Sequence, residues 1–122
     1  MKFAKYTINA AGIYGLIVVL PQYFLKEKNG RDFPPAITHP EYYYGFVGVA
    51  LAFQIAFLII ARDPVRYRMM MIPAMIEKFS FAFAVFALFA FARVAPMLVA
   101  AATIDLILGL LFIAAYLKTK EE

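Results

Sequence analysis

Cysteine and tryptophan are both missing from this sequence, and histidine occurs once, at position 39. Without cysteine the chain has no disulfide, no thiol nucleophile and no thiolate ligand for an iron–sulfur cluster. A single histidine leaves too few imidazole groups for a His-rich zinc or haem site within one chain. We therefore expect neither a metal nor a cofactor.

Charged residues are also scarce, at 16% of the chain, whereas 65% of the 122 residues are hydrophobic. A globular domain is about 45–50% apolar. The excess lies in four runs, each long enough to cross a bilayer, which takes about 20 residues. We predict an all-α fold, a bundle of four transmembrane helices at about 3–25, 40–61, 64–91 and 96–117. Because the bundle uses the whole length, residues 1–122 are expected to form a single membrane domain.

The first run starts with Lys2 and Lys5 and contains Asn9 and Gly12, without a small-residue cleavage site after a short apolar core. We interpret it as a retained first helix and not as a signal peptide. Pro21 predicts that the last turn of this helix is kinked or terminated.

The connection to the second helix, residues 26–37, is predicted to be the longest loop. Asn29-Gly30 is a turn signal, and Pro34-Pro35 favours an extended segment. Residues 38–41, with the sequence THPE, have the form of a capping box in which Pro40 occupies the first helical turn.

The connection between the second and third helices is a tight turn. Asp63 is expected to cap the third helix and Pro64 to fill its first position. Pro73 predicts a bend inside that helix, since proline removes a backbone hydrogen bond. Residues 93–96 are expected to form a short turn before the fourth helix.

Basic residues gather at helix ends and not in a stripe on one soluble face. The net charge of +4 therefore indicates membrane orientation and no nucleic-acid partner. Four spans place both termini and the turn near residue 63 on the side with more basic residues, which predicts cytoplasmic termini. That side has Lys2, Lys5, Arg62, Arg66, Arg68, Lys118 and Lys120, and the other has Lys26, Lys28, Arg31 and Arg93.

Each helix contributes polar residues at a similar depth, namely Asn9, Gln54, Glu77 with Lys78, and Asp105. A charge at the bilayer centre costs about 2.5–3.5 kcal/mol on insertion scales, so these charges are expected to turn inward and compensate one another. Glu77 and Lys78 are neighbours on one helix and point about 100° apart. This favours Asp105 as the partner of Lys78, with Glu77 as the alternative.

Two interpretations of this polar centre stay open. In the first, the ion pair and the two amides only fix helix packing. In the second, the five side chains line a small ligand-binding pocket, in which Glu77 or Asp105 is a catalytic acid or base.

The basic turn Arg62, Arg66 and Arg68 is expected at the membrane surface, where it sets topology and contacts anionic lipid headgroups. A specific phosphate or carboxylate site at the mouth of the bundle is the alternative interpretation.

Several stretches, in their order along the chain, carry a resemblance to known proteins. They are residues 39–46 (HPEYYYGF), 62–68 (RDPVRYR), 77–80 (EKFS) and Asp105 before Leu108-Gly109. On this pattern the chain resembles an uncharacterised family of small bacterial four-helix integral membrane proteins, similar in size and helix number to DoxX-like proteins. Its topology is similar to that of the EXPERA sterol isomerases and ligand binders, which place carboxylates inside a four-helix bundle. The resemblance implies a multi-pass protein of a bacterial inner membrane.

Three functions are compatible with these observations. The first is a membrane protein whose polar centre binds a lipophilic small molecule or supports a partner membrane subunit. The second is a membrane-embedded isomerase or lipid-modifying enzyme that uses Asp105 or Glu77 as acid or base. The third is a proton-coupled transporter acting as a homodimer. The absence of an acid from the first helix counts against a small multidrug transporter.

Overall fold

A computed structural model describes residues 2–32, 38–91 and 96–119, which are helical over nearly their whole length and contain no strand. The elements are α1 (Lys2–Val19), η1 (Leu20–Phe24), α2 (Lys26–Asp32), α3 (Pro40–Arg62), η2 (Arg68–Met70), α4 (Met71–Ala90) and α5 (Pro96–Thr119). Four segments are long and apolar enough to cross a membrane: Lys2–Phe24, Pro40–Arg62, Arg68–Ala90 and Leu98–Thr119. The predicted all-α bundle of four membrane-spanning helices is confirmed.

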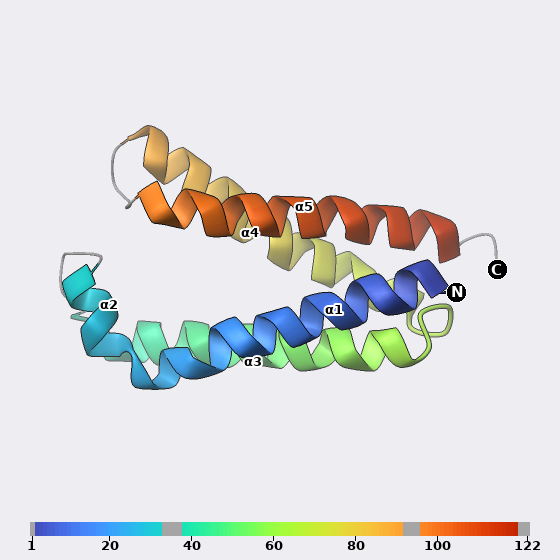
Figure 1. The fold of residues 1–122 in the computed structure, drawn as a ribbon, viewed down its shortest axis with the longest axis horizontal. Coiled ribbons are helices and arrows are strands. Elements are labelled where there is room, and N and C mark those ends of the chain that lie inside the picture. Colours follow the sequence, from blue (N-terminus) through green and yellow to red (C-terminus); the bar gives the residue numbers. More distant parts are fainter. Residues whose placement is uncertain (1, 33–37, 92–95, 120–122) are drawn as a thin grey trace.

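The four long helices are arranged as two pairs. Helix α1 packs along α3, and α4 packs along α5, while α1 also contacts α5 and α3 contacts α4. Figure 1 shows the pairs closest together at the end where α1 begins and α5 ends, and farther apart at the opposite end. The starts of α1 and α4 and the ends of α3 and α5 therefore share one end of the bundle.

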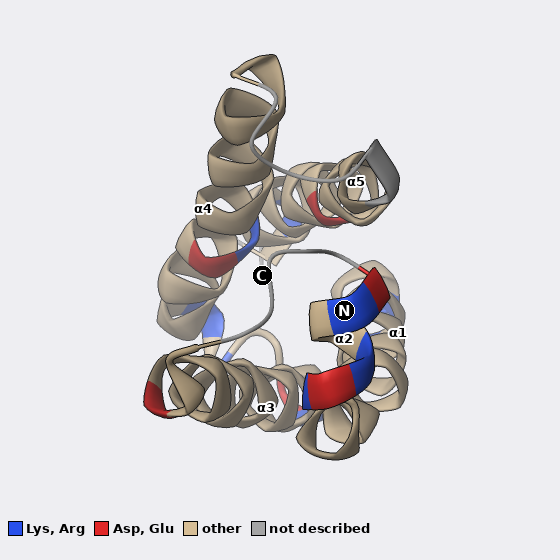
Figure 2. Cartoon of the chain, turned by 90° about the vertical axis from the view of Figure 1, so that its left-hand side faces the viewer, with Lys and Arg blue, Asp and Glu red and all other residues tan. Residues whose placement is uncertain are grey.

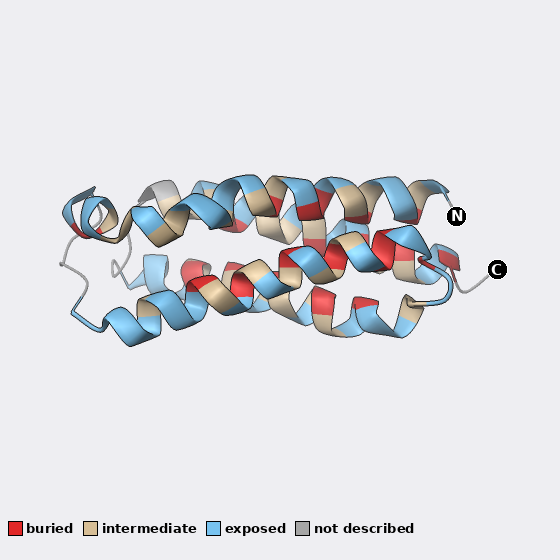
Figure 3. Ribbon diagram, turned by 90° about the horizontal axis from the view of Figure 1, so that it is seen from below, coloured by how far each residue is buried: buried red, intermediate tan, exposed pale blue. Residues whose placement is uncertain are grey.

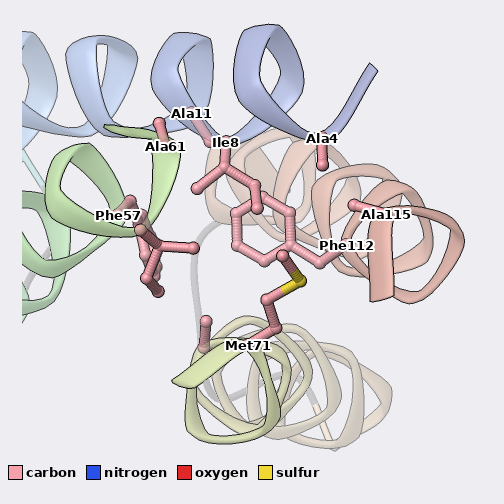
Figure 4. Packing of buried hydrophobic residues seen from close by; sticks show 10 residues of the cluster. Ala4, Ile8, Ala11, Phe57, Ala61, Met71, Phe112 and Ala115 are labelled. Atoms are coloured by element: carbon pink, nitrogen blue, oxygen red, sulfur yellow. The ribbon is translucent and has the colours of Figure 1, made fainter. Parts of the chain in front are cut away.

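The main hydrophobic core lies at that shared end and receives side chains from all four long helices. The Phe57 ring of α3 meets the Phe112 ring of α5 edge-on, with 5.1 Å between ring centroids. Ile8 of α1 and Met71 of α4 fill the space around these rings, as Figure 4 shows. Alanines at 4, 11, 61, 74 and 115 bring the helix backbones close to this centre.

A second, smaller core belongs to α4 and α5 alone. It consists of Ala82 and Val85 from α4 and Ala102 from α5. Towards the middle of the pair, the Phe79 ring lies against Gly109, where an added Cβ would come within 2.9 Å of the ring. The two helix pairs are thus joined mainly through the core at the shared end.

Outside these cores the helices present apolar side chains to their surroundings. Ile17 of α1, Val49 of α3, Phe83 of α4 and Leu110 of α5 are all exposed. Figure 3 shows buried positions on the facing sides of the helices and exposed positions on their outer sides. Helices of this length with an apolar outer surface are typical of a multi-pass membrane protein.

The first and last spans follow the sequence prediction closely. Helix α1 gives way to the 3-10 helix η1 at Leu20, next to Pro21, so the predicted termination at Pro21 is confirmed. Helix α5 extends to Thr119, two residues beyond the predicted end.

The prediction of a loop throughout residues 26–37 is wrong for its first half, because Lys26–Asp32 forms helix α2. The amide of Asn29 donates to Oε1 of Gln22 at 2.6 Å and to the hydroxyl of Tyr43 at 3.0 Å. Lys28 and Asp32 also form an ion pair one helical turn apart. These contacts hold Asn29-Gly30 in a helix in spite of its turn propensity. The predicted extended segment at 34–35 lies outside the described residues.

The predicted capping box at residues 38–41 is also wrong. Helix α3 does begin at Pro40, but its N-cap residue is His39, which makes no side-chain cap hydrogen bond. The carboxylate of Glu41 lies 3.1 Å from Nδ1 of His39 and so does not reach back to an N-cap amide.

The third span starts later than predicted. Asp63 is the C-cap of α3, and its carboxylate accepts a hydrogen bond from the amide of Arg66 at 3.3 Å, which closes the turn. Pro64 therefore lies in this turn and not at the first position of a helix. Pro73 was predicted to lie inside a helix and to bend it. It is instead the third residue of α4, within the first turn, where proline is tolerated. The span changes from 3-10 helix to α-helix just before it, at Met71. The predicted turn at 93–96 begins in residues that are not described.

The close approach of α1 and α3 depends on Gly15. A Cβ built at this position would lie 1.8 Å from Oε1 of the buried Gln54. The amide of Gln54 meanwhile donates to the carbonyl of Ala50 at 2.8 Å. A side chain at position 15 must therefore push Gln54 out of its place.

We predict that Gly15→Ala lowers the free energy of unfolding by about 1–3 kcal/mol, the usual cost of overpacking. Gly45→Ala is the matched control, since a Cβ there meets nothing within 4 Å and alanine is the better helix former. Unfolding by sodium dodecyl sulfate in mixed micelles measures both. The double variant Gly15→Ala/Gln54→Ala should recover stability relative to Gly15→Ala, and equal stability of the two glycine variants contradicts the prediction.

Candidate functional site

Lys78 is a charged residue within the bundle. Its side chain is 3% exposed, and it comes from the inward face of α4 together with Met71, Ala74 and Ala82. Its ammonium donates to Oδ1 of Asp105 on α5 at 3.4 Å. It also lies 5.2 Å from the centroid of the Phe57 ring on α3, a cation–π distance. One ammonium thus links α3, α4 and α5.

Glu77 is the second carboxylate near this ammonium, with Oε2 at 3.8 Å from Nζ of Lys78. Within the described ranges, Oε2 is buried and accepts no hydrogen bond. Lys78 therefore contacts both acids that were candidates for its partner, and the hydrogen bond goes to Asp105. Figure 2 shows the acidic and basic segments side by side on α4, in a ribbon that is otherwise mostly uncharged.

The three charges do not balance. One ammonium faces two carboxylates, so the cluster has a formal charge of −1 when both acids are ionised. The Glu77 and Asp105 side chains are 19% and 16% exposed, although Oε2 of Glu77 is itself buried. Because charge is costly inside a membrane, the extra negative charge has to be met by a proton, a cation or a donor group.

The two amides expected in the same centre make other contacts. Gln54 packs against Gly15 and bonds to its own helix, and its Oε1 has no hydrogen-bond partner among the described residues. Asn9 lines a hollow with Lys5 and Arg62. Glu77, Lys78 and Asp105 are therefore the three predicted site residues that come together.

The three arginines of the basic turn have different surroundings. Arg62 borders the hollow that contains Asn9. The exposed Arg66 lies 5.5 Å from the ring of Tyr67. Arg68 contacts Tyr116 of α5 in two ways. Its Nε donates to the backbone carbonyl of Tyr116 at 3.0 Å, and its guanidinium carbon lies 3.6 Å from the centroid of the Tyr116 ring.

Two hollows lie on the surface of the described part of the chain. The first, about 230 Å³, lies between α1 and α3. The second, about 500 Å³, is an apolar groove along α4, bordered by Ile76, Phe79, Phe83 and Tyr116. Neither of these two hollows is lined by Glu77 or Asp105.

Sequence reasoning missed the aromatic partners of the charges. Phe57 beside Lys78 and Tyr116 beside Arg68 sit in apolar runs where nothing marks them as different from other aromatic residues. The sequence contained one weak signal for these contacts, namely that each aromatic residue lies on another helix at about the same depth as the cation.

Among the described residues, no group of three or more His, Cys, Asp or Glu side chains has an arrangement that holds a metal ion. Comparisons of this protein with family models, with curated proteins and with solved structures found no match.

We predict that Lys78→Met destabilises the fold by about 3–5 kcal/mol, because it leaves two half-buried carboxylates without their cation. Lys2→Met is the control, since Lys2 is exposed at the start of α1. Unfolding in mixed micelles measures both variants. Adding Asp105→Asn to Lys78→Met should recover part of the loss, whereas wild-type stability of Lys78→Met would show that the pair is dispensable.

Proposed function

We propose that this chain is a bacterial inner-membrane protein, with both termini in the cytoplasm, that binds a lipophilic molecule beside the Lys78–Asp105 ion pair. In this proposal the ion pair is structural and Glu77 is the group that meets the ligand. The ligand has an apolar body, suited to the membrane, and a hydroxyl or protonated amine that donates to the carboxylate.

The observation that supports this assignment is the unequal bonding of the two acids. Asp105 accepts a hydrogen bond from Lys78 at 3.4 Å, whereas Oε2 of Glu77 lies 3.8 Å away and accepts none from the described residues. A buried acceptor without a donor costs about 1–3 kcal/mol, and more when it is charged. A ligand that brings a donor to this carboxylate removes that cost.

The position of the carboxylate also suits such a ligand. It lies on α4, close to the core at the shared end, whereas the far ends of the two helix pairs have no common core. In this proposal the ligand approaches Glu77 sideways, from the lipid side of α4.

Acid–base catalysis is the second candidate, and the same observation favours it. A catalytic carboxylate has to exchange its proton with a substrate, so it has to be free of a permanent partner. Glu77 has the longer contact with Lys78 and accepts no hydrogen bond from it, so it meets this criterion better than Asp105. An isomerase or lipid-modifying reaction would use Glu77 as acid or base.

The test is to identify what copurifies with the protein in a mild detergent, using mass spectrometry of lipid extracts. We expect a lipophilic hydroxyl- or amine-bearing species with the wild type, reduced about tenfold or more in Glu77→Gln, because a hydrogen bond to a charged group contributes about 1.5–3 kcal/mol. Glu27→Gln is the matched control, since Glu27 is an exposed carboxylate on α2. Glu77→Gln should retain wild-type stability.

Identical extracts from the wild type and both variants would contradict ligand binding at Glu77. In that case reconstitution into liposomes distinguishes the remaining functions. Proton flux that depends on Glu77 would indicate a transporter, and copurification of a second membrane protein would indicate a subunit.

A further inference from the structure

A second polar site lies between the start of α1 and the end of α3. The hollow of about 230 Å³ is lined by Lys5, Tyr6 and Asn9 from α1 and by Ala61 and Arg62 from α3. It combines two cationic side chains with a phenol and an amide, which are both hydrogen-bond donors. Ala61, with its small side chain, leaves the space open. This combination of groups is one that binds a phosphate.

The charges around the hollow favour an anion. The ion pairs between described residues involve neither Lys5 nor Arg62. The nearest acid along the chain, Asp63, is exposed and accepts a hydrogen bond from the amide of Arg66. Among the described residues, the lining of the hollow therefore has two basic side chains and no acidic one.

The hollow also has the depth expected for a lipid headgroup. With a rise of 1.5 Å per residue, Asn9 lies about 10 Å along α1 from Lys2. The headgroup layer on each side of a bilayer is about 5–8 Å thick. With Lys2 at the water boundary, Lys5 and Arg62 lie at the headgroup level, and Asn9 lies near the start of the acyl chains.

Apolar side chains continue from the hollow along both helices. Ile13 follows Asn9 by one turn on α1, and Ile59 precedes Arg62 by about one turn on α3. Both isoleucines are about half exposed, at 47% and 50%. They offer a surface on which acyl chains can lie below a bound headgroup.

Arg66 and Arg68, the other two arginines of the basic turn, do not belong to this hollow. Arg68 is committed to Tyr116 on α5, and Arg66 lies beside Tyr67 on the exposed turn. Proximity in sequence grouped the three arginines, but only Arg62 meets α1 side chains around a common space.

We propose that this hollow is a specific binding site for the phosphate group of an anionic phospholipid. Lys5 and Arg62 neutralise the headgroup, Tyr6 and Asn9 donate hydrogen bonds to it, and the acyl chains lie along Ile13 and Ile59. The site is independent of the Glu77 cluster.

The test is native mass spectrometry in a neutral detergent with 1-palmitoyl-2-oleoyl-phosphatidylglycerol, and with the corresponding phosphatidylcholine as the zwitterionic comparison. We expect the wild type to prefer phosphatidylglycerol. The double variant Lys5→Gln/Arg62→Gln should lose about 25-fold in affinity, since each basic residue near an anionic headgroup contributes about 1 kcal/mol. Arg66→Gln, a matched loss of charge on the same turn, should bind within about twofold of the wild type.

Asn9→Ala separates a built site from a diffuse positive potential, because it removes a donor without changing the charge. Lower phosphatidylglycerol affinity in Asn9→Ala, with unchanged helix content by circular dichroism, supports the site. Equal losses in Arg66→Gln and the double variant, or unchanged affinity in Asn9→Ala, would overturn it. Displacement of the lipid by millimolar inorganic phosphate would overturn the lipid assignment in favour of a soluble phosphate.

Discussion

The burial of the Lys78 ammonium is the constraint on which the arrangement of three helices depends. A cation in the interior of a membrane protein needs counter-charge and polarisable neighbours, and here these come from Asp105 on α5, Glu77 on α4 and the Phe57 ring on α3. Each partner fixes the rotation of its helix about its own axis. The hydrophobic cores set how closely the helices approach, whereas the charge cluster decides which faces meet.

The bundle is most tightly joined at the end where α1 begins and α5 ends. There the Phe57 and Phe112 rings, together with several alanines, form a core shared by all four long helices. The opposite half of α4 and α5 has its own small core. The two candidate sites differ accordingly: the Glu77 cluster links α4 to α5 and α3, and the phosphate hollow lies on the α1 and α3 pair.

The number of membrane helices and most of their bounds were predictable because hydropathy and length dominate the energetics of crossing a bilayer. The ion pair between Lys78 and Asp105 was predictable for the same reason, since an unpaired charge is costly inside a bilayer. The contacts of Asn9 and Gln54 were not predictable, because a neutral amide can bond within its own helix or face a hollow, and so depth does not determine its direction. Helix α2 was missed because its Asn29 is held by Gln22 and Tyr43, contacts that only the tertiary structure creates.

The order of the two pairs along the chain has a consequence for biogenesis. Helices α1 and α3 are made first and can associate in the bilayer while the ribosome is still synthesising the rest. Helix α4 then enters with Glu77 and Lys78 and lacks its interhelical salt-bridge partner until α5 delivers Asp105. Without α5, the carboxylate near the Lys78 ammonium is that of Glu77 on its own helix. The last helix to be made is thus the one that completes the charge cluster.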